Sequence, residues 1–284
     1  MATATAGLIP NWFPPTRENH ALIVSIWQWF PLAASLQWLI PWYGMGKTSV
    51  TSRFNLPGRI GWLTMEAPGF LTLLYHMRTL TPTLSQNGGG EGLPWQNKFL
   101  ATLFVTHYAY RALLFPFLQP SMSPLHVVIW LSGAAFQVTN GLAIGAWLAA
   151  YGPTTQAEWA DQISTGQEIR RRAGRRAGSG KKDGKEGKNG KDGKGGATTG
   201  VDKHYEIPQA GLFKVMLYPH YFVEWVEWFG FWMAAGWGCV PARCFLLNEI
   251  AAMLPRAVSG RKWYVEKFGE EKIRGRWAVI PGVW

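Results

Sequence analysis

Residues 125–151 read LHVVIWLSGAAFQVTNGLAIGAWLAAY, and this stretch decides the fold class that the sequence predicts. It contains no Asp, Glu, Lys or Arg, and Asn140 places a strongly polar group near its middle. A helix that spans a bilayer needs about 20 mostly apolar residues, so this stretch is long enough to cross. Trp147 near its end fits an anchor at the membrane interface. We therefore interpret residues 125–151 as a membrane span.

Five more apolar stretches lie on either side of this one: 21–43, 60–77, 99–118, 221–240 and 244–254. Residues 60–77 are slightly short for a span, and residues 244–254 are clearly short. The alternative is a large soluble protein with buried helices, but too little amphipathic surface remains to cover so many apolar helices. The pattern predicts an all-α fold, a polytopic integral membrane helical bundle with about six spans.

The positive charge of the chain is concentrated in one segment. The formal net charge is +11, yet residues 170–194 alone hold eleven Lys or Arg against three Asp or Glu, which leaves only +3 elsewhere. Residues 178–196 are rich in Gly and Lys, a composition that favours a solvated, disordered loop. Binding of this loop to anionic lipid or nucleic acid is the alternative, but we expect no nucleic-acid partner. A loop so basic beside spans is retained on the cytoplasmic side.

The same loop divides the chain. We expect N-terminal membrane helices with substrate-site residues at 1–160, the disordered basic loop at 161–203 and a C-terminal membrane domain at 204–284. Residues 1–11 lack the features of a cleaved signal peptide. Cys239 and Cys244 lie in an apolar stretch without His or acidic neighbours, and we interpret them as buried thiols.

Ionisable and polar side chains inside apolar stretches are expensive, so each is a functional candidate by default. Glu66 lies in residues 60–77, and His107, Tyr108 and Arg111 lie in residues 99–118. His107 and Arg111 are one helical turn apart, so they share a face if this stretch is a helix.

The richest cluster is PHYFVEWVEW at residues 219–228. On a helix, His220, Glu224 and Glu227 fall at i, i+4 and i+7, which is one face. Their partners could be a metal, a counter-cation, or the amide and hydroxyl groups of an organic cofactor. No HExxH or CxxC motif is present, so we expect no metal site.

Nucleotide-binding loops of the common kinds are not indicated. Residues 44–49 read GMGKTS and end like a phosphate-binding loop, but the glycine required five positions before the Gly-Lys pair is Pro41. The sequence also has no GxGxxG motif, so no Rossmann fold is expected. A nicotinamide cofactor would therefore have to bind in a helical membrane site.

The C-terminal part carries several motifs in a fixed order. They are YEIP at 205–208 with GLF at 211–213, PHYFVEWVEWFGF at 219–231, LPRA at 254–257, WYVEKF at 263–268, and Arg276 before IP at 280–281. Further upstream are Tyr43-Gly44 with Lys47, LPGR and MEAPGF around Glu66, His107-Tyr108 with Arg111, and Asn140-Gly141. In this order and spacing, the sequence resembles the steroid 5α-reductase family.

The resemblance implies a helical enzyme of the endoplasmic reticulum membrane with seven spans and NADPH bound inside the bundle. It implies hydride transfer to the β-carbon of an enone in a hydrophobic substrate, typically a 3-oxo-4-ene steroid. It places Tyr108 and Glu66 at the substrate carbonyl. The positions it assigns to binding or supporting the cofactor are Asn140, Arg111, Tyr205, His220, Glu224, Glu227, Arg256, Tyr264 and Arg276.

These residue types suit the chemistry. Hydride addition to an enone builds negative charge on the carbonyl oxygen, which a donor placed beforehand in a dry site stabilises. A Tyr hydroxyl is a suitable donor, and a Glu kept neutral by apolar surroundings would reinforce it. Arg256 and Arg276 are expected to contact the NADPH phosphates, because a guanidinium matches phosphate geometry; snorkelling to the membrane interface is the alternative for both.

The pattern departs from the family in one large respect. The family has a fifth span before the segment that corresponds to Tyr205, and this span ends in a motif that binds the cofactor. Residues 152–204 contain no apolar run long enough to span and no such motif. Either a misjoined exon has removed it, or the chain is a divergent member that has lost reductase activity and only binds lipid. Smaller departures are Met65 and Ser259-Gly260, at positions where the family often has a polar residue and a His pair. A very-long-chain enoyl-CoA or polyprenol reductase is the alternative enzymatic interpretation, since the hydride chemistry is the same.

Overall fold

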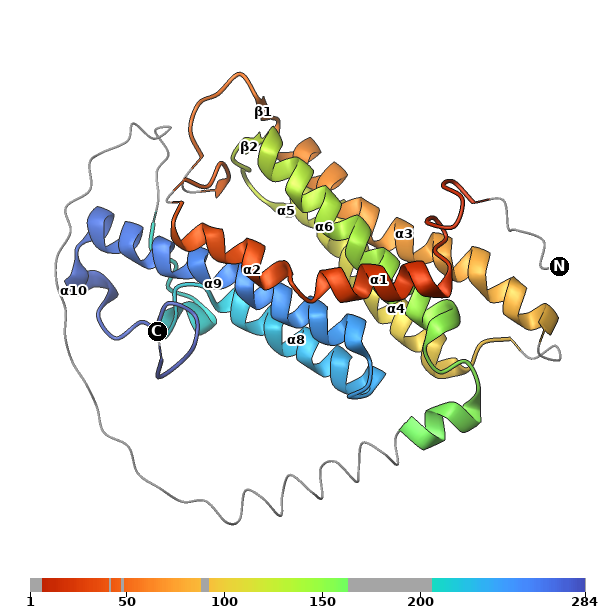
Figure 1. Ribbon diagram of the computed structural model, residues 1–284. Coiled ribbons are helices and arrows are strands. Elements are labelled where there is room, and N and C mark those ends of the chain that lie inside the picture. The colour runs from red at the N-terminus through yellow and green to blue at the C-terminus, as the bar shows by residue number, and fades with distance from the viewer. Residues whose placement is uncertain (1–6, 41, 47–48, 88–91, 163–205, 284) are drawn as a thin grey trace, which may run out of the picture.

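The computed structural model describes residues 7–40, 42–46, 49–87, 92–162 and 206–283, and of residues 82–87 it describes the backbone alone (Figure 1). These residues are mostly helical, which confirms the all-α prediction. The basic loop predicted at 161–203, apart from its first two residues, and the predicted site residue Tyr205 lie outside the described residues.

The described helices lie in two parts of the chain, one before and one after the basic loop. Those of the N-terminal part are α1 (Arg17–Trp27), α2 (Phe30–Ala34), η1 (Ser35–Trp38), α3 (Gly58–Asn87), α4 (Trp95–Ala109), η3 (Tyr110–Leu114), α5 (Phe115–Leu118), α6 (Val127–Ala146) and η4 (Trp147–Tyr151). Those of the C-terminal part are η5 (Gly211–Lys214), α8 (Pro219–Ala235), α9 (Val240–Phe268) and α10 (Glu270–Ile273). A further short helix covers 156–162.

Each apolar stretch of the sequence lies in a helix or a run of helices. Residues 21–38 lie in α1, α2 and η1 in succession, with Pro31 in the first turn of α2, where its missing N–H is tolerated. Residues 244–254 are clearly short for a span, and the structure shows that they belong to a longer helix. They are only the middle of the 29-residue α9, which at about 1.5 Å per residue is longer than a bilayer core is thick.

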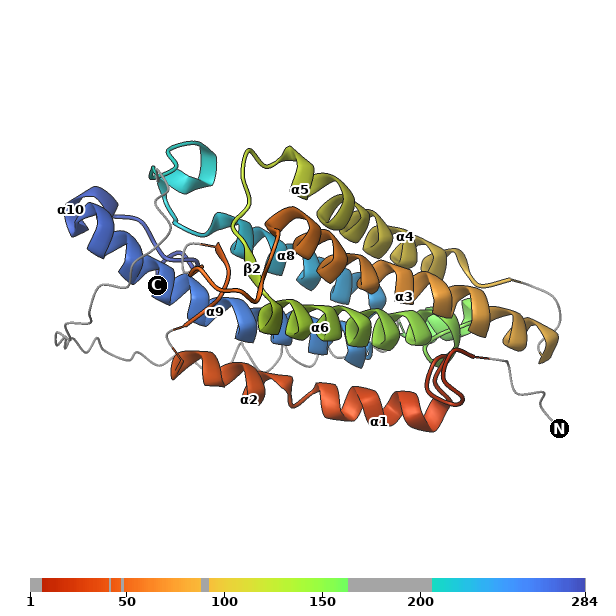
Figure 2. The same cartoon turned by 90° about the horizontal axis from the view of Figure 1, so that it is seen from above.

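The helices form layers. Figure 2 shows α1 and α2 along one side, α4 and α5 along the opposite side, and α3, α6, α8 and α9 between them. The strands β1 (Asn55–Leu56) and β2 (Leu125–His126) pair antiparallel with Asn55 opposite His126. Because each strand directly precedes a long helix, α3 and α6 begin at the same end of the bundle and run parallel.

Glycines allow α3 and α6 to approach closely. A Cβ added at Gly141 would overlap the backbone oxygen of Gly69, and one at Gly145 would lie 2.9 Å from Cα of Leu73. The two glycines are one helical turn apart, the spacing by which membrane helices bring their backbones together. This contact fixes α3, and with it Glu66, against α6.

Two predictions about apolar character have different outcomes. Cys239 and Cys244 are free thiols and both are buried, as predicted. Among the described residues, one helical segment, Val127–Tyr151, is both long and apolar enough by its composition to cross a membrane. It is the stretch from which the fold class was predicted, whereas the crossing of the other helices stays a prediction.

Candidate active site

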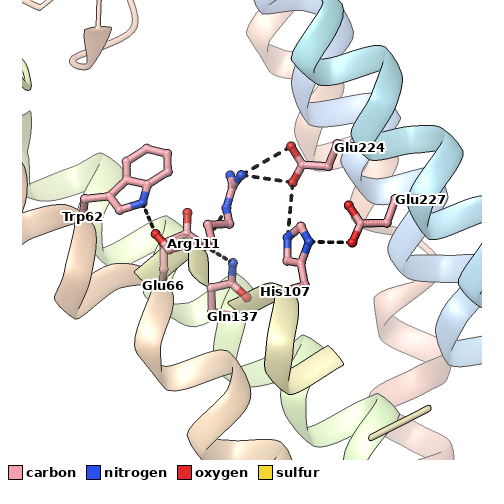
Figure 3. A network of polar contacts seen from close by, with 7 residues as sticks. All are labelled: Trp62, Glu66, His107, Arg111, Gln137, Glu224 and Glu227. Carbon is pink, nitrogen blue, oxygen red and sulfur yellow. Dashed lines mark hydrogen bonds and ion pairs between the residues drawn. The ribbon is translucent and has the colours of Figure 1, made fainter. Parts of the chain in front are cut away.

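A buried network of charged side chains lies where α3, α4, α6 and α8 meet (Figure 3). Its centre is Arg111, which follows α4 in the π-helical segment η3, a local widening that often occurs at functional sites. The Arg111 Nε lies 3.2 Å from Oε2 of Glu66, and its Nη1 lies 3.2 Å from Oε1 of Glu224. The guanidinium is therefore fixed between two carboxylates from different helices. Its face also lies 5.1 Å from the ring of Trp62, whose Nε1 donates to the Arg111 carbonyl oxygen.

The network continues at both ends. Gln137 on α6 donates from Nε2 to Oε2 of Glu66 at 2.6 Å. At the other end, Nδ1 of His107 lies 2.8 Å from Oε1 of Glu227, while its Nε2 lies 4.0 Å from Glu224. Glu227 is half-exposed, whereas Glu66 and Glu224 are buried. Residues separated by more than a hundred positions are thus tied into one polar chain across the bundle.

A cavity of about 300 Å³, here named the Glu66 cavity, borders this network. Its polar wall includes Glu66, Arg111, Gln137, Glu249 and Arg256. The remaining wall is mostly apolar and includes Phe30, Ile40, Trp62, Met65, Ile129, Phe136 and Met253. A largely apolar cavity with a few convergent polar groups at one side suits a lipid-like molecule with a single polar end.

A second cavity of about 380 Å³, the His220 cavity, adjoins the first. Aromatic side chains dominate its wall, among them Tyr218, Tyr221, Trp263 and Tyr264. Burial raises the pKa of Tyr218, which precedes α8, and nearby Tyr221 raises it further. The Tyr218 hydroxyl therefore keeps its proton at neutral pH and is able to donate a hydrogen bond into the cavity.

The two cavities have part of their wall in common. The shared residues are Gln37, Ile40, Trp42, Tyr43, Met45 and Arg256. The Arg256 guanidinium lies 4.2 Å from the Tyr43 ring centre, and its Nε donates to Gln37 at 3.4 Å. Molecules bound in the two cavities would therefore meet at this shared wall.

The predicted site residues fall into three groups. Those that line a cavity are Glu66, Arg111, His220, Arg256 and Tyr264. Those that support such residues from behind are Glu224 and Glu227, through Arg111 and His107. The third group, Tyr108, Asn140 and Arg276, lines neither cavity.

Each member of the third group has its own surroundings. Tyr108 is 1% exposed, packs against Phe104 and Trp228, and lies within electrostatic range of Glu66 and Arg111. Asn140 is fully buried, and neither its side-chain nitrogen nor its oxygen has a hydrogen-bond partner among the described residues. Arg276 donates to the backbone oxygen of Pro208, which lines the His220 cavity.

The structure adds polar wall residues that the sequence analysis did not select. Glu249 was missed because residues 244–254 were judged too short to span, so a charge within them received no weight. Gln137 was missed because an uncharged amide in an apolar stretch is a weak signal. The neutral form of Glu66 stays a prediction; in the structure Arg111 and Gln137 both contact its carboxyl group.

Comparisons with known proteins bear on the family of the chain. Residues 198–284 match the family described as 3-oxo-5-alpha-steroid 4-dehydrogenase. The chain is 32% identical to the uncharacterized protein C9.08c of Schizosaccharomyces pombe over 263 residues, 83% of this chain and 87% of that protein. It is 28% identical to steroid 5-alpha-reductase DET2 of Solanum lycopersicum, over 89% of this chain and 91% of the relative. It is 29% identical to 3-oxo-5-alpha-steroid 4-dehydrogenase 1 of Bos taurus, over 81% and 83%.

Proposed function

The chain belongs to the steroid 5α-reductase (3-oxo-5-alpha-steroid 4-dehydrogenase) family of oxidoreductases, and from this premise we propose the reaction that it catalyses. It reduces the C=C bond of an α,β-unsaturated ketone in a hydrophobic substrate such as a 3-oxo-4-ene steroid, with NADPH as the reductant. The observation that carries the proposal is the pair of adjoining cavities, one with an apolar body and a charged end, the other aromatic and rich in donors.

We place the protein in the endoplasmic reticulum membrane as a multi-pass bundle with the basic loop on the cytoplasmic side. Large apolar side chains are exposed on the outside of the helices, for example Ile26 and Leu32 on α1 and α2, Leu103 on α4, and Val226 on α8. Exposed apolar faces on several sides of one bundle fit contact with lipid. The charged residues of α3, η3 and α9 lower the average hydropathy of those segments, yet Glu66, Arg111, Glu249 and Arg256 line internal cavities.

The substrate carbonyl would lie against Arg111 in the Glu66 cavity. Negative charge develops on this oxygen during the reduction, and a guanidinium held beforehand between two carboxylates stabilises it without rearranging. Glu66 acts as the orienting group, fixed in turn by Gln137. Tyr108 is proposed as a second donor. Its hydroxyl makes no hydrogen bond to another described residue.

The His220 cavity has the donor set that a nicotinamide nucleotide requires. The hydroxyls of Tyr218 and Tyr264 suit ribose and amide oxygens, aromatic rings suit the planar base, and Arg256 suits a phosphate. Arg276 and His220 are proposed to complete this set, with Glu224 and Glu227 supporting it. When bound, NADPH supplies a hydride to the β-carbon of the enone. The wall that the two cavities share keeps the reacting parts together and away from water.

The test is an assay of the full-length protein in microsomes or detergent with NADPH. A steroid enone, a very-long-chain enoyl-CoA and an unsaturated polyprenol-type substrate are compared by NADPH oxidation and by mass spectrometry of the product. We expect reduction of the steroid enone. Faster reduction of either other substrate would reassign the substrate class. The absence of NADPH oxidation with all three would overturn the reductase proposal and leave a lipid-binding family member.

A further inference from the structure

Glu249 on α9 carries a carboxyl that is buried beside the Glu66 cavity. It is 7% exposed and lines that cavity together with Met253 and Arg256, which follow it at i+4 and i+7 on one helix face. No hydrogen bond or ion pair joins its carboxyl to another residue in the part of the chain that the structure describes. A polar group buried in this way requires a partner, and here the cavity itself is the place from which one could come.

The surrounding charges decide in which form this carboxyl is useful. Glu249 lies within electrostatic range of Glu66, Glu224, Arg111 and Arg256. Arg111 pairs with both of those carboxylates and Arg256 lines the same cavity, so two negative charges face two positive charges before Glu249 is counted. An ionised Glu249 would add a third negative charge that no further cation of this group balances. Glu249 in its acid form avoids this cost and has a proton to donate.

Glu66 is unsuited to that role. Its Oε2 accepts from both Arg111 and Gln137, so it is occupied as an acceptor. The two carboxyls of one cavity therefore have different environments, the arrangement by which two acidic groups take separate parts in one reaction. Glu66 orients the cation that faces the carbonyl oxygen, and Glu249 remains as the proton donor.

We propose that Glu249 is the general acid that protonates the α-carbon of the substrate. The inference rests on the proposed function. Addition of the nicotinamide hydride to the β-carbon leaves an enolate, whose electron pair then forms the new C–H bond at the α-carbon. The O–H bond of Glu249 breaks, its electrons stay on the carboxylate, and the carboxylate regains a proton from water. The reduced nucleotide is oxidised by two electrons and the C=C bond is reduced by two.

The test uses the reverse of this proton transfer and requires no cofactor. The full-length protein in detergent is incubated in D₂O with the saturated ketone product, and deuterium at the α-carbon is followed by mass spectrometry. The wild type should accelerate the exchange, because a group that donates a proton to the enolate also removes it from the ketone. Glu249→Gln should lower the enzymatic exchange by about 100-fold, within the usual range for a general acid. Glu249→Asp, which keeps the acid on a shorter side chain, should retain part of it.

Glu266→Gln is the matched control, since Glu266 is an exposed residue of the same helix that lines neither cavity. Glu266→Gln should exchange deuterium like the wild type.

If Glu249→Gln does not fold, as judged by thermal unfolding in detergent, the test depends on Glu249→Asp. Undiminished exchange in Glu249→Asp, with an unchanged pH dependence, then overturns the role of Glu249 as the acid. Wild-type exchange in Glu249→Gln also overturns it. If the wild type oxidises NADPH with the enone but shows no exchange, only Glu249 is misassigned. If it does neither, the proposed function fails and the inference falls with it.

Discussion

Replacement of Arg111 by Met should destabilise the protein more than any other single change to the charged network. The substitution keeps most of the volume of the side chain but removes the guanidinium that lies between Glu66 and Glu224. Both carboxylates would be left without their cation. The side chains are 24% exposed for Arg111, 3% for Glu66 and 10% for Glu224, so solvent screens these contacts only weakly.

The magnitude follows from the hydrogen bonds that the substitution removes. Each charge-assisted hydrogen bond contributes about 1.5–3 kcal/mol, and Arg111 makes one to each carboxylate, which sets a range of about 3–6 kcal/mol. Removal of one partner from a buried ion pair typically costs about 3–5 kcal/mol. We therefore expect a loss of about 4 kcal/mol. Glu66→Gln should cost less, about 1–2 kcal/mol, because Arg111 still pairs with Glu224 and an amide can still accept its hydrogen bond.

Chemical unfolding of the detergent-solubilised protein, followed by the fluorescence of its 17 Trp, measures both changes. Arg53→Met is the control, because Arg53 lies exposed in a loop, and it should leave the free energy of unfolding unchanged. In the double variant Arg111→Met with Glu66→Gln, the loss should be smaller than the sum of the single losses, since the second change removes a charge that the first left unpaired. A loss below about 0.5 kcal/mol for Arg111→Met, the scale of ordinary surface substitutions, would refute the buried ion pair.

Three further substitutions separate the site from its scaffold. Tyr108→Phe should lower kcat by about 100-fold with little change in stability, because the Tyr108 hydroxyl stabilises the enolate. Tyr110, exposed on the adjoining turn, is the control, and Tyr110→Phe should leave kcat unchanged. Equal kcat values for the two variants would show that Tyr108 contributes packing alone. Gly141→Ala places a Cβ on the backbone oxygen of Gly69 and should lower the free energy of unfolding by about 1–3 kcal/mol. Gly230→Ala is the control: a Cβ added at Gly230 has no other atom within 4 Å, so this change should be neutral or slightly stabilising. Unfolding in denaturant measures both. Gly260→Ala pushes against the Tyr218 hydroxyl and should raise the KM for NADPH several-fold at little cost in kcat, and an unchanged KM would place the nucleotide elsewhere.

The helices were predictable from the sequence because apolar runs of this length have few other solutions. Residues 125–151 correspond closely to β2, α6 and η4. The prediction was weakest for α9. Glu249 interrupts its apolar run and Arg256 follows the end of that run, although both side chains line a cavity. Composition along the chain records how apolar a helix is, but not which of its faces meets a neighbour.

The candidate site was predictable as a set of residues but not as a set of contacts. Glu66 and Arg111 were selected because each lies in an apolar stretch. Nothing in their spacing indicates that one guanidinium pairs with Glu66 and with Glu224, which is 113 positions further along the chain. That pairing depends on how closely α3, α4 and α8 approach, which side-chain packing determines. For the same reason the contacts of Glu224 with Arg111 and His107 were not predicted, and its support of the cofactor stays a prediction.

The position of the chain ends around α8 bears on the missing span. Gln162 donates to the carbonyl oxygen of Ala235 at the last residue of α8, while Pro208 lines the same cavity as His220 at its beginning. The described chain therefore stops at one end of α8 and resumes at the other, which at about 1.5 Å per residue are roughly 25 Å apart. The sequence between these two ends contains eleven Lys or Arg between 170 and 194 and no apolar run long enough to span. Both cavities and the charged network form from residues on either side of this connection. The departure from the family thus lies in this connection, and a misjoined exon stays our prediction for it.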